Sequence, residues 1–341
     1  MTNANIFLPA EWHHQAFVQL TWPHEKTDWA YMLDEVEACF TEIAKAVSCR
    51  EKLLIVTPHP ARVEAHLAAA GAEMGNITFF ACDTNDTWAR DHAFITLLGG
   101  DAPHYVDFCF NGWGGKFEAA LDNAINRKLI DAGVVKGEYR NSLDYILEGG
   151  SIESDGNGTL LTTSQCLMAP GRNDMTKEEI EEKLRATLHC KHILWLDHGN
   201  LIGDDTDGHV DTIARLAPQD TIIYMQGDEL DTEQWDDLKK MEEQIAALRT
   251  PNGKPYRMLP LPSPSPIHDE DGERLPATYA NFLIMNGAVL YPTYAQPEKD
   301  AQAAQVLQTA FPAHEIVGID CRALIKQHGS LHCVTMQYPQ P

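Results

Sequence analysis

The sequence lacks the features that mark several classes of protein. Its 341 residues contain no apolar run near the roughly 20 residues of a membrane span. The first residues, MTNANIFLPAEWHHQAF, lack the basic and then apolar profile of a secretory signal, so we expect a cytoplasmic protein. The eight cysteines form no CxxC pair, and neither a disulfide framework nor a zinc ribbon is therefore expected.

Basic residues are also scarce. The chain has 26 Lys and Arg against 50 Asp and Glu, which gives a net charge of −24. Such a charge repels nucleic acid and anionic membranes and attracts cations. We therefore expect no nucleic-acid or membrane partner, and a small cationic substrate fits. Acidity that only keeps the protein soluble is an equally open interpretation.

Helical and strand patterns alternate along the chain. Residues 29–47 have apolar positions at helical spacing, and a strand pattern follows at 52–59. A second helix is expected to stop at Gly71. The alternation continues to residue 320 and favours the α/β class. The Pro-rich residues 259–277 are expected to form a long surface loop, either a lid or a connection.

Five stretches resemble one another in composition, with β-prone residues interrupted by Gly, Asp, Glu, His or Cys. They are NDTWARDHAFITL, YILEGGSIESD, TDGHVDTIARL, YANFLIMNGAVLYP and GSLHCVTMQY. Their centres recur about every 60 residues, with one longer gap. Recurrence at a nearly fixed spacing suggests about five repeated units, although the stretches are too unlike to establish this alone.

Cys333 lies in the last of these stretches. If SLHCVTMQY is a strand, alternation puts Cys333 and Thr335 on the more polar face, so that the thiol points into a cleft. A lone cysteine is more often inert core than nucleophile. Both interpretations stay open on these residues alone.

The stretch GDDTDGHVD concentrates carboxylates around one histidine. A calcium loop is excluded because Gly203 and Ala214 stand where that pattern needs acids. A divalent-metal site lacks a second nearby His. A solvated acidic turn is favoured for three of the carboxylates, namely Asp204, Asp205 and Asp207.

Other residues of these stretches could carry chemistry. His209 and Asp211 are expected on one face of a strand, where a proton carrier would lie beside a carboxylate that grips a cation. Trp88 and Asp91 stand in WARD, and Glu148 precedes two glycines that allow close backbone approach. Trp88 fits a core position as well as a ligand platform. Together these groups would make an acidic pocket around a thiol, which suits a guanidinium.

The motifs NDTWARDHAF, LEGGSI, GDDTDGHVD and HC resemble, in this order, those of the agmatine deiminase and bacterial peptidylarginine deiminase family. The segments TWPHEKTDW, NGWGGKF and GTLLTTSQCLMAPGRN are similar as well, so the resemblance spans nearly the whole chain. It implies the pentein fold, a five-bladed pseudo-symmetric α/β propeller of ββαβ units. That fold would form a single catalytic domain over residues 1–341.

The resemblance also implies roles for individual residues. Cys333 matches the nucleophile, His209 the general acid and base, and Asp91 and Asp211 the carboxylates that hold the guanidinium. Glu148 matches the acid that orients substrate and histidine. The implied catalytic set is Cys333, His209, Glu148, Asp91 and Asp211, and the implied substrate-binding set is Asp91, Asp211, Glu148, Trp88 and Trp113.

The implied reaction converts agmatine and water to N-carbamoylputrescine and ammonia. A covalent thiouronium would form on the cysteine, and neither a metal nor an organic cofactor is expected. The chain departs from the family pattern at RDHAF and QHGSLHC. Ala93, Phe94, Ser330 and Leu331 are expected to change the pocket wall or the glycine-rich approach to the thiol.

Alternatives remain on the sequence. A deiminase for free or peptidyl arginine would need a cationic grip on a carboxylate, for which the candidates are Arg90, Arg172, Arg215 and Arg322. For Arg90, a structural ion pair with Asp91 is an equal alternative. A metal-dependent hydrolase and a non-catalytic guanidine- or polyamine-binding protein are the other two classes. A homo-oligomer is compatible with the sequence.

Overall fold

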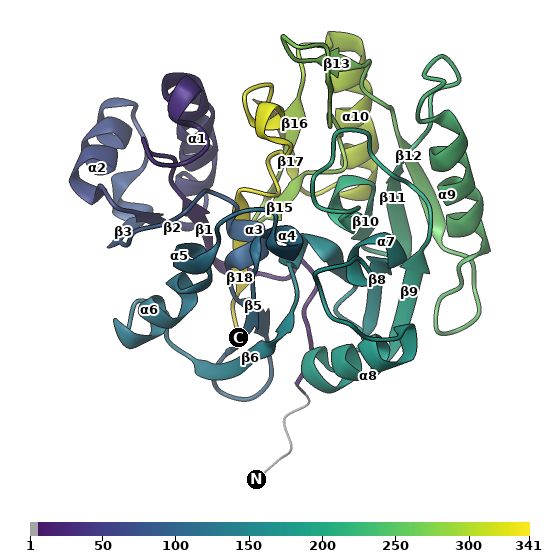
Figure 1. Ribbon diagram of the computed structural model, residues 1–341, viewed down its shortest axis with the longest axis horizontal. Coiled ribbons are helices and arrows are strands. Elements are labelled where there is room, and N and C mark those ends of the chain that lie inside the picture. The colour runs from purple at the N-terminus through teal and green to yellow at the C-terminus, as the bar shows by residue number, and fades with distance from the viewer. Residues whose placement is uncertain (1–5) are drawn as a thin grey trace.

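The computed structural model describes residues 6–341 and has a mixed α/β fold (Figure 1). Residues 1–5 of the expected domain lie outside the described part. Within that part the strands form six sheets. No helix between residues 6 and 341 is long and apolar enough to cross a membrane.

Four of the sheets have three strands each and follow one pairing scheme. The first two strands pair antiparallel, and the third pairs parallel with the second after a helical connection. The sheets consist of β4 (Ile95–Leu97), β5 (His104–Cys109) and β6 (Glu138–Ile146); β7 (Ile152–Ser154), β8 (Thr159–Thr163) and β9 (His192–Leu196); β10 (Ala214–Ala217), β11 (Thr221–Met225) and β12 (Arg257–Leu261); and β15 (Leu283–Met285), β16 (Ala288–Thr293) and β17 (Glu315–Asp320).

A fifth sheet follows the same scheme but joins the two ends of the chain. The last strand, β18 (Thr335–Pro339), pairs antiparallel with β1 (Gln15–Thr21). Strand β1 then pairs parallel with β2 (Lys52–Thr57), which pairs parallel with β3 (Ile77–Ala81). The segment just before β18, which contains Cys333, is thereby anchored to the start of the chain.

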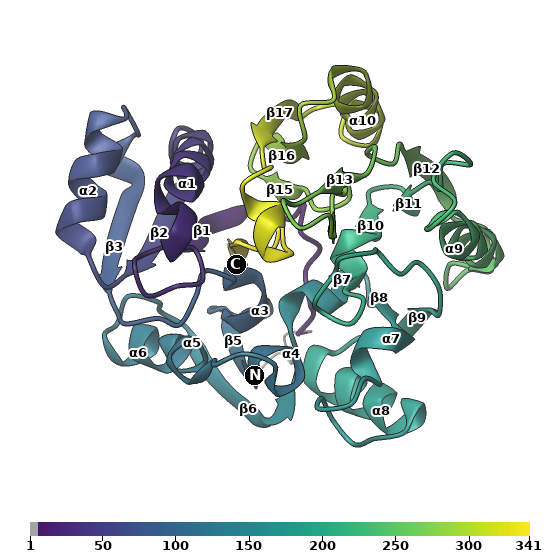
Figure 2. The same cartoon turned by 45° about the horizontal axis from the view of Figure 1, so that its top comes forward.

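The longer helices cross between parallel strands and lie toward the outside of the molecule (Figure 2). They are α1 (Leu33–Ser48), α2 (Pro60–Ala69), α8 (Lys177–Leu188), α9 (Trp235–Ala247) and α10 (Pro297–Ala310). Helix α1 buries the apolar face predicted at 29–47, including Val36, Phe40 and Ile43. Helix α8 begins with a capping box between Thr176 and Glu179.

The remaining helices are short. They are α3 (Ala89–His92), α4 (Gly112–Gly115), α5 (Ala120–Asn123), α6 (Ile125–Asp131), α7 (Ser164–Leu167), η1 (Ala30–Met32), η2 (Met74–Asn76), η3 (Gly149–Ser151), η4 (Val210–Thr212) and η5 (Leu324–Gln327). Helix α2 ends as expected, because Gly71 adopts φ 79° just beyond it.

The five motif stretches occupy equivalent places. Trp88 to Phe94, Glu148 to Ser151, His209 to Ile213, Asn281 to Phe282 and Leu331 to Val334 each lead directly into the first strand of a sheet, namely β4, β7, β10, β15 and β18. Helix α3 contacts η3, and η3 contacts η4. Residues far apart in sequence therefore meet where these first strands begin.

Residues 259–277 are not one loop. Residues 259–261 end the edge strand β12, in which Pro260 pairs with Tyr224. A hairpin of β13 (Ile267–His268) and β14 (Arg274–Leu275) follows. The prediction was wrong because proline excludes a central strand and is tolerated in an edge strand.

Candidate active site

A small pocket, with a cavity volume of about 40 Å³, opens where the motif stretches meet. Its walls combine four aspartates, three aromatic rings and one thiol, and no Lys or Arg is among them in the described chain. The lining residues are Asp28, Asp86, Trp88, Asp91, Trp113, Phe117, Asp205, Thr206, Gln327, His328, Gly329 and Cys333. Four of the residues expected from the sequence, Trp88, Asp91, Trp113 and Cys333, therefore share one pocket.

Asp91 projects from the single turn of α3 and is held by two donors. The indole Nε1 of Trp113 donates to Oδ2 at 2.9 Å, and the backbone N–H of Gly150 donates to Oδ1 at 3.1 Å. Burial, together with the neighbouring Asp211 and Glu148, raises the pKa of Asp91 well above its usual range. A cation beside Asp91 would relieve this repulsion.

His209, Glu148 and Asp211 lie next to Asp91 and are fully buried. His209 Nδ1 is 3.7 Å from Asp91 Oδ1. Within residues 6–341, both ring nitrogens of His209, Oε2 of Glu148 and Oδ1 of Asp211 have no hydrogen-bond partner. Buried polar atoms usually have a partner, which can be protein, water, an ion or a ligand. The four unpaired atoms lie beside a pocket, so a bound cation could complete them.

The protonation states of these groups follow from burial and from their neighbours. Burial lowers the pKa of His209 to about 4, so the ring is neutral at ordinary pH. Burial alone would raise the pKa of Asp211, but a 2.7 Å hydrogen bond with Nδ1 of His332 and the electrostatic attraction of that ring hold the pKa below its usual range. Asp211 is thus ready to accept a cation.

Gly150 lies at the centre of this group. A Cβ on Gly150 would come within 2.6 Å of His209 Nδ1, 3.0 Å of Asp91 Oδ1 and 3.1 Å of Asp211 Oδ2. A Cβ on Gly149 would come within 2.2 Å of the carbonyl oxygen of Arg90. The close backbone approach predicted for the two glycines is confirmed, because any larger residue would fill the space between the carboxylates.

Cys333 is buried, but it lies in a turn before β18 and not in the strand. Strand alternation was therefore the wrong basis for predicting where the Cys333 side chain points. The backbone N–H and the thiol of Cys333 both donate to Oδ1 of Asn281, each at 3.3 Å. Burial, with Asp211 and Asp91 nearby, raises the pKa of the thiol well above its usual range. The free protein holds a thiol here, not a thiolate.

His209 and Asp211 are not on a strand either. His209 caps the 3₁₀ turn η4, which contains Asp211, and β10 begins only at residue 214. The two side chains nevertheless reach the same centre, because the turn brings both toward Gly150. The strand expected for these two residues was therefore wrong.

The acidic turn is only partly solvated, because two of its three carboxylates are paired within the protein. Oδ2 of Asp204 accepts a hydrogen bond from the backbone N–H of Gly208 at 2.8 Å, and Thr206 also donates to this carboxylate. Asp207, at φ 64°, pairs with Lys116 at 2.8 Å and with Arg172 at 2.7 Å. These carboxylates shape the turn, and Asp205 joins the pocket wall.

The four candidate arginines have other partners. Arg172 pairs with Glu148 at 2.8 Å, Arg215 pairs with Glu11 and Glu153, and Arg322 pairs with Asp320. Arg90 donates from its backbone N–H to the carbonyl of Cys333 at 3.1 Å, and its guanidinium lies toward Met336 and Glu11. The alternative for Arg90, a structural ion pair with Asp91, does not form within residues 6–341.

The residues that depart from the family pattern do not form the pocket wall as expected. All four are buried, but none is among the residues that line the pocket: Ala93, Phe94, Ser330 and Leu331. Ser330 is hydrogen-bonded to the hydroxyl of Tyr294 at 3.1 Å. The wall at this point is Gly329, where a Cβ would come within 2.1 Å of the Trp88 ring. Trp88 is thus both buried and part of the pocket.

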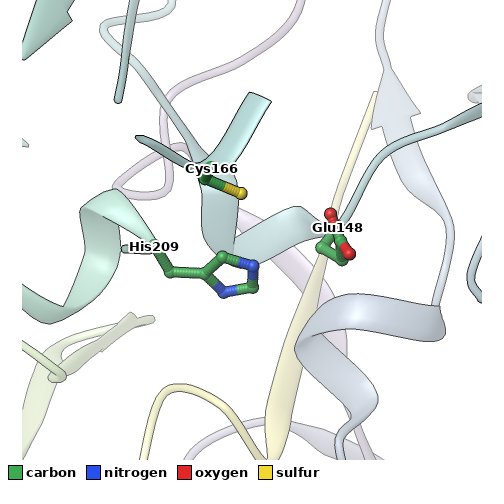
Figure 3. Close-up of side chains that lie close together, drawn as sticks. All are labelled: Glu148, Cys166 and His209. Atoms are coloured by element: carbon green, nitrogen blue, oxygen red, sulfur yellow. The ribbon is translucent and has the colours of Figure 1, made fainter. Parts of the chain in front are cut away.

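Among residues 6–341, two groups of buried side chains have the composition of a metal site. One consists of Glu148, Cys166 and His209, which point toward one another from three segments (Figure 3). The other consists of Glu11, Glu153 and His332. In the second group both carboxylates are ion-paired with Arg215, which leaves little reason for a cation to bind.

Sequence reasoning missed Asn281, Cys166 and the role of Arg172. Asn281 lies in YANFLIMNGAVLYP, so its place in the five-fold recurrence was the available signal. Arg172 and Cys166 lie in GTLLTTSQCLMAPGRN, outside the recurring stretches. Nothing in their local sequence indicates that they reach Glu148 and His209.

A mixed α/β fold that places a buried histidine and three buried carboxylates beside a pocket lined by a thiol is that of a guanidino-group-modifying enzyme. The family model described as Porphyromonas-type peptidyl-arginine deiminase matches residues 7–339. The chain belongs to this family, whose members hydrolyse guanidinium groups.

Three similar proteins illustrate the family. A proposed agmatine deiminase of Shewanella sp. (strain W3-18-1) is 34% identical over 99% of each chain. A protein of Porphyromonas gingivalis, solved as a proposed arginine deiminase, is 50% identical over 98% of each chain, with a TM-score of 0.93. The C. jejuni agmatine deiminase, solved as a Cys-to-Ser variant with substrate bound, is 37% identical over 100% of this chain and 98% of its own, with a TM-score of 0.91.

Proposed function

We propose that this protein hydrolyses agmatine to N-carbamoylputrescine and ammonia, with Cys333 as the nucleophile. The observation that carries the proposal is the set of unpaired buried atoms on His209, Glu148 and Asp211, next to a pocket that contains Cys333. A guanidinium is planar, positively charged and rich in donors, so it complements paired carboxylates. Asp91 and Asp211 would hold it, and Glu148 would orient it.

The reaction would begin when His209 takes the proton of the Cys333 thiol and the sulfur attacks the guanidinium carbon. The protonated His209 would pass this proton to one nitrogen of the tetrahedral adduct, the C–N bond would break, and ammonia would leave a thiouronium on Cys333. His209 would then take a proton from water, whose oxygen attacks the same carbon. Loss of the thiolate gives the ureido product, and the acid and base roles alternate on one residue.

The substrate would help to activate its own attacker. In the free protein the thiol of Cys333 has a raised pKa, and His209 is neutral. A guanidinium bound between Asp91 and Asp211 would compensate the two carboxylates that disfavour the thiolate. Cys333 would therefore become nucleophilic only when a cation is bound.

Three further carboxyl groups of the pocket support agmatine over arginine. Asp28, Asp86 and Asp205 line it, and an ammonium there would be favoured, because it would pair with these groups and lower the raised pKa of Asp86. None of the four candidate arginines lines the pocket, so none is placed to hold a substrate carboxylate there. One observation favours the second candidate substrate, free or peptidyl arginine. It is the 50% identity to the P. gingivalis protein, which was solved as a proposed arginine deiminase.

The proposal includes one catalytic domain over the whole chain, arranged as a five-bladed propeller. Five sheets with one pairing scheme support it, as does the pairing of β18 with β1 across the two ends of the chain. Each motif stretch would then lie at the inner end of one blade.

The test is a substrate panel with the purified protein. Ammonia and ureido product are measured with agmatine, free arginine and a C-terminal arginyl peptide, each with and without a chelator. We expect turnover of agmatine that the chelator does not reduce. Preference for arginine or the peptide would select the second candidate, loss of turnover with chelator would favour a metal-dependent hydrolase, and no turnover of any guanidine would favour a binding protein.

A further inference from the structure

Cys166 lies beside the proposed active site and has no part in the deiminase reaction. It belongs to α7, directly after β8, and its side chain is fully buried. Its sulfur, one carboxylate oxygen of Glu148 and one ring nitrogen of His209 all lie within 4.8 Å of one another. Figure 3 shows the three side chains directed toward a common space.

Two of these three residues have buried atoms without a partner. Oε2 of Glu148 and both ring nitrogens of His209 accept or donate no hydrogen bond within the described chain. Both side chains are fully buried. A neutral imidazole nitrogen and a carboxylate oxygen are lone-pair donors, as a thiolate is. The group therefore presents three metal-binding atoms of three different residues to one point.

The donor set matches one kind of cation. Zn²⁺ and chemically similar ions take sulfur, imidazole nitrogen and carboxylate oxygen in tetrahedral geometry, with ligand atoms about 3.3–3.8 Å apart. Side-chain rotations that bring the three atoms together by about 1 Å would suffice. Hard ions such as Mg²⁺ and Ca²⁺ prefer oxygen ligands alone and would not use Cys166.

The surroundings would support such an ion. Arg172 holds the other oxygen of Glu148, at 2.8 Å, and so fixes the direction of the carboxylate. The carboxylate and the thiolate together would balance the charge of a divalent cation. The proton of the Cys166 thiol would pass to solvent when the Cys166–metal bond forms.

We infer that Glu148, Cys166 and His209 form an inhibitory site for Zn²⁺ or a similar soft divalent cation. Metal and substrate would compete, because both require the free oxygen of Glu148 and the ring of His209. This site would switch the enzyme off, which is the opposite of what a metal-dependent hydrolase predicts. The inference goes beyond the proposed reaction, and binding of the ion does not depend on which guanidine is the substrate.

The test uses Co²⁺ as a spectroscopic probe and Zn²⁺ for stoichiometry, on the full chain with reduced thiols. Wild type, Cys333→Ala and a control, Cys190→Ala, should each show sulfur-to-cobalt charge-transfer absorption and bind one tightly held Zn²⁺. Cys166→Ser should lose the absorption and bind Zn²⁺ at least tenfold more weakly. His209→Ala, which leaves α7 unchanged, should also bind Zn²⁺ at least tenfold more weakly and serves if Cys166→Ser does not fold.

Activity gives a second readout if agmatine is turned over. Zn²⁺ should raise the apparent KM of wild type with little effect on kcat, and a chelator should reverse this. Cys166→Ser should retain turnover and resist Zn²⁺ at least tenfold better. An unchanged cobalt spectrum in Cys166→Ser, or loss of the spectrum in Cys333→Ala alone, would overturn the inference.

Discussion

Arg172 donates a hydrogen bond from Nε to Oε1 of Glu148 at 2.8 Å, and both side chains are buried. The other guanidinium nitrogens of Arg172 bond Asp207 at 2.7 Å and the carbonyl of Thr206 at 2.9 Å. One oxygen of Glu148 is thereby fixed, and the other is free beside His209. Arg172 is thus a positioning residue and not a substrate contact.

Replacement of Arg172 by Met should destabilise the fold. It leaves Glu148 buried without its partner, and loss of one member of a buried pair costs about 3–5 kcal/mol. The free energy of unfolding in urea measures this. The control is Arg322→Met, which breaks an exposed pair with Asp320 and should change stability by less than about 1 kcal/mol. Equal stability of both variants, with altered preference between agmatine and arginine, would show instead that Arg172 contacts substrate.

Gly150→Ala should abolish catalysis and leave the fold intact. The new methyl group would stand 2.6 Å from His209 Nδ1 and 3.0 Å from Asp91 Oδ1, where the guanidinium is expected. A misplacement of about 1 Å costs on the order of 10²-fold, so kcat/KM for agmatine should fall at least that far. The matched control is Gly75→Ala, whose Cβ would meet nothing closer than 3.5 Å. Full activity of Gly150→Ala would place substrate elsewhere.

The thiol of Cys333 should react with iodoacetamide slowly at neutral pH. Burial and the neighbouring Asp211 and Asp91 raise its pKa well above the usual range, so little thiolate forms. The rate of inactivation, measured from pH 6 to 10, should rise through the pKa of a free thiol, about 8.5, without a plateau. A rate that is constant between pH 6 and 8 would instead indicate a thiolate formed before substrate binds.

Ionisation of Asp86 should lower the free energy of unfolding as the pH rises. Burial, with Asp122 and Asp28 nearby, raises its pKa to about 8 in the folded protein, against about 3.9 when unfolded. The folded protein therefore keeps a proton on Asp86 that the unfolded chain loses. The resulting stabilisation of the fold is complete below about pH 3.9 and is lost as the pH rises through about 8. In Asp86→Asn, the free energy of unfolding should fall less between pH 5 and 9 than in wild type. Parallel curves would show that Asp86 is already ionised.

The sequence predicted which residues lie close together better than it predicted their local geometry. The helix at 29–47 and the alternation of strands and helices were predictable because amphipathic spacing reports burial directly. Cys333, His209 and Asp211 were found by motif, but all three lie in turns that precede strands. Strand alternation extends no further than the hydrogen-bonded ladder, which begins only at Thr335 and Ala214.

The partners that hold these residues could not be predicted. Arg172 and Glu148 are 24 positions apart, and Asn281 and Cys333 are 52 apart. Local spacing contains no information on such contacts, because the packing of separate sheets brings them together. The buried Cys166 illustrates the same limit, since in sequence it resembles any core cysteine of a strand-to-helix turn.

The most direct test of the account is the rate of ammonia release from agmatine by Cys333→Ala, compared with wild type and with Cys190→Ala. If Cys333 is the nucleophile, turnover should fall by about 10⁴-fold or more in Cys333→Ala, and the melting temperature should stay near that of wild type. Cys190→Ala should retain turnover. A Cys333→Ala protein that keeps activity within tenfold of wild type would contradict the covalent mechanism.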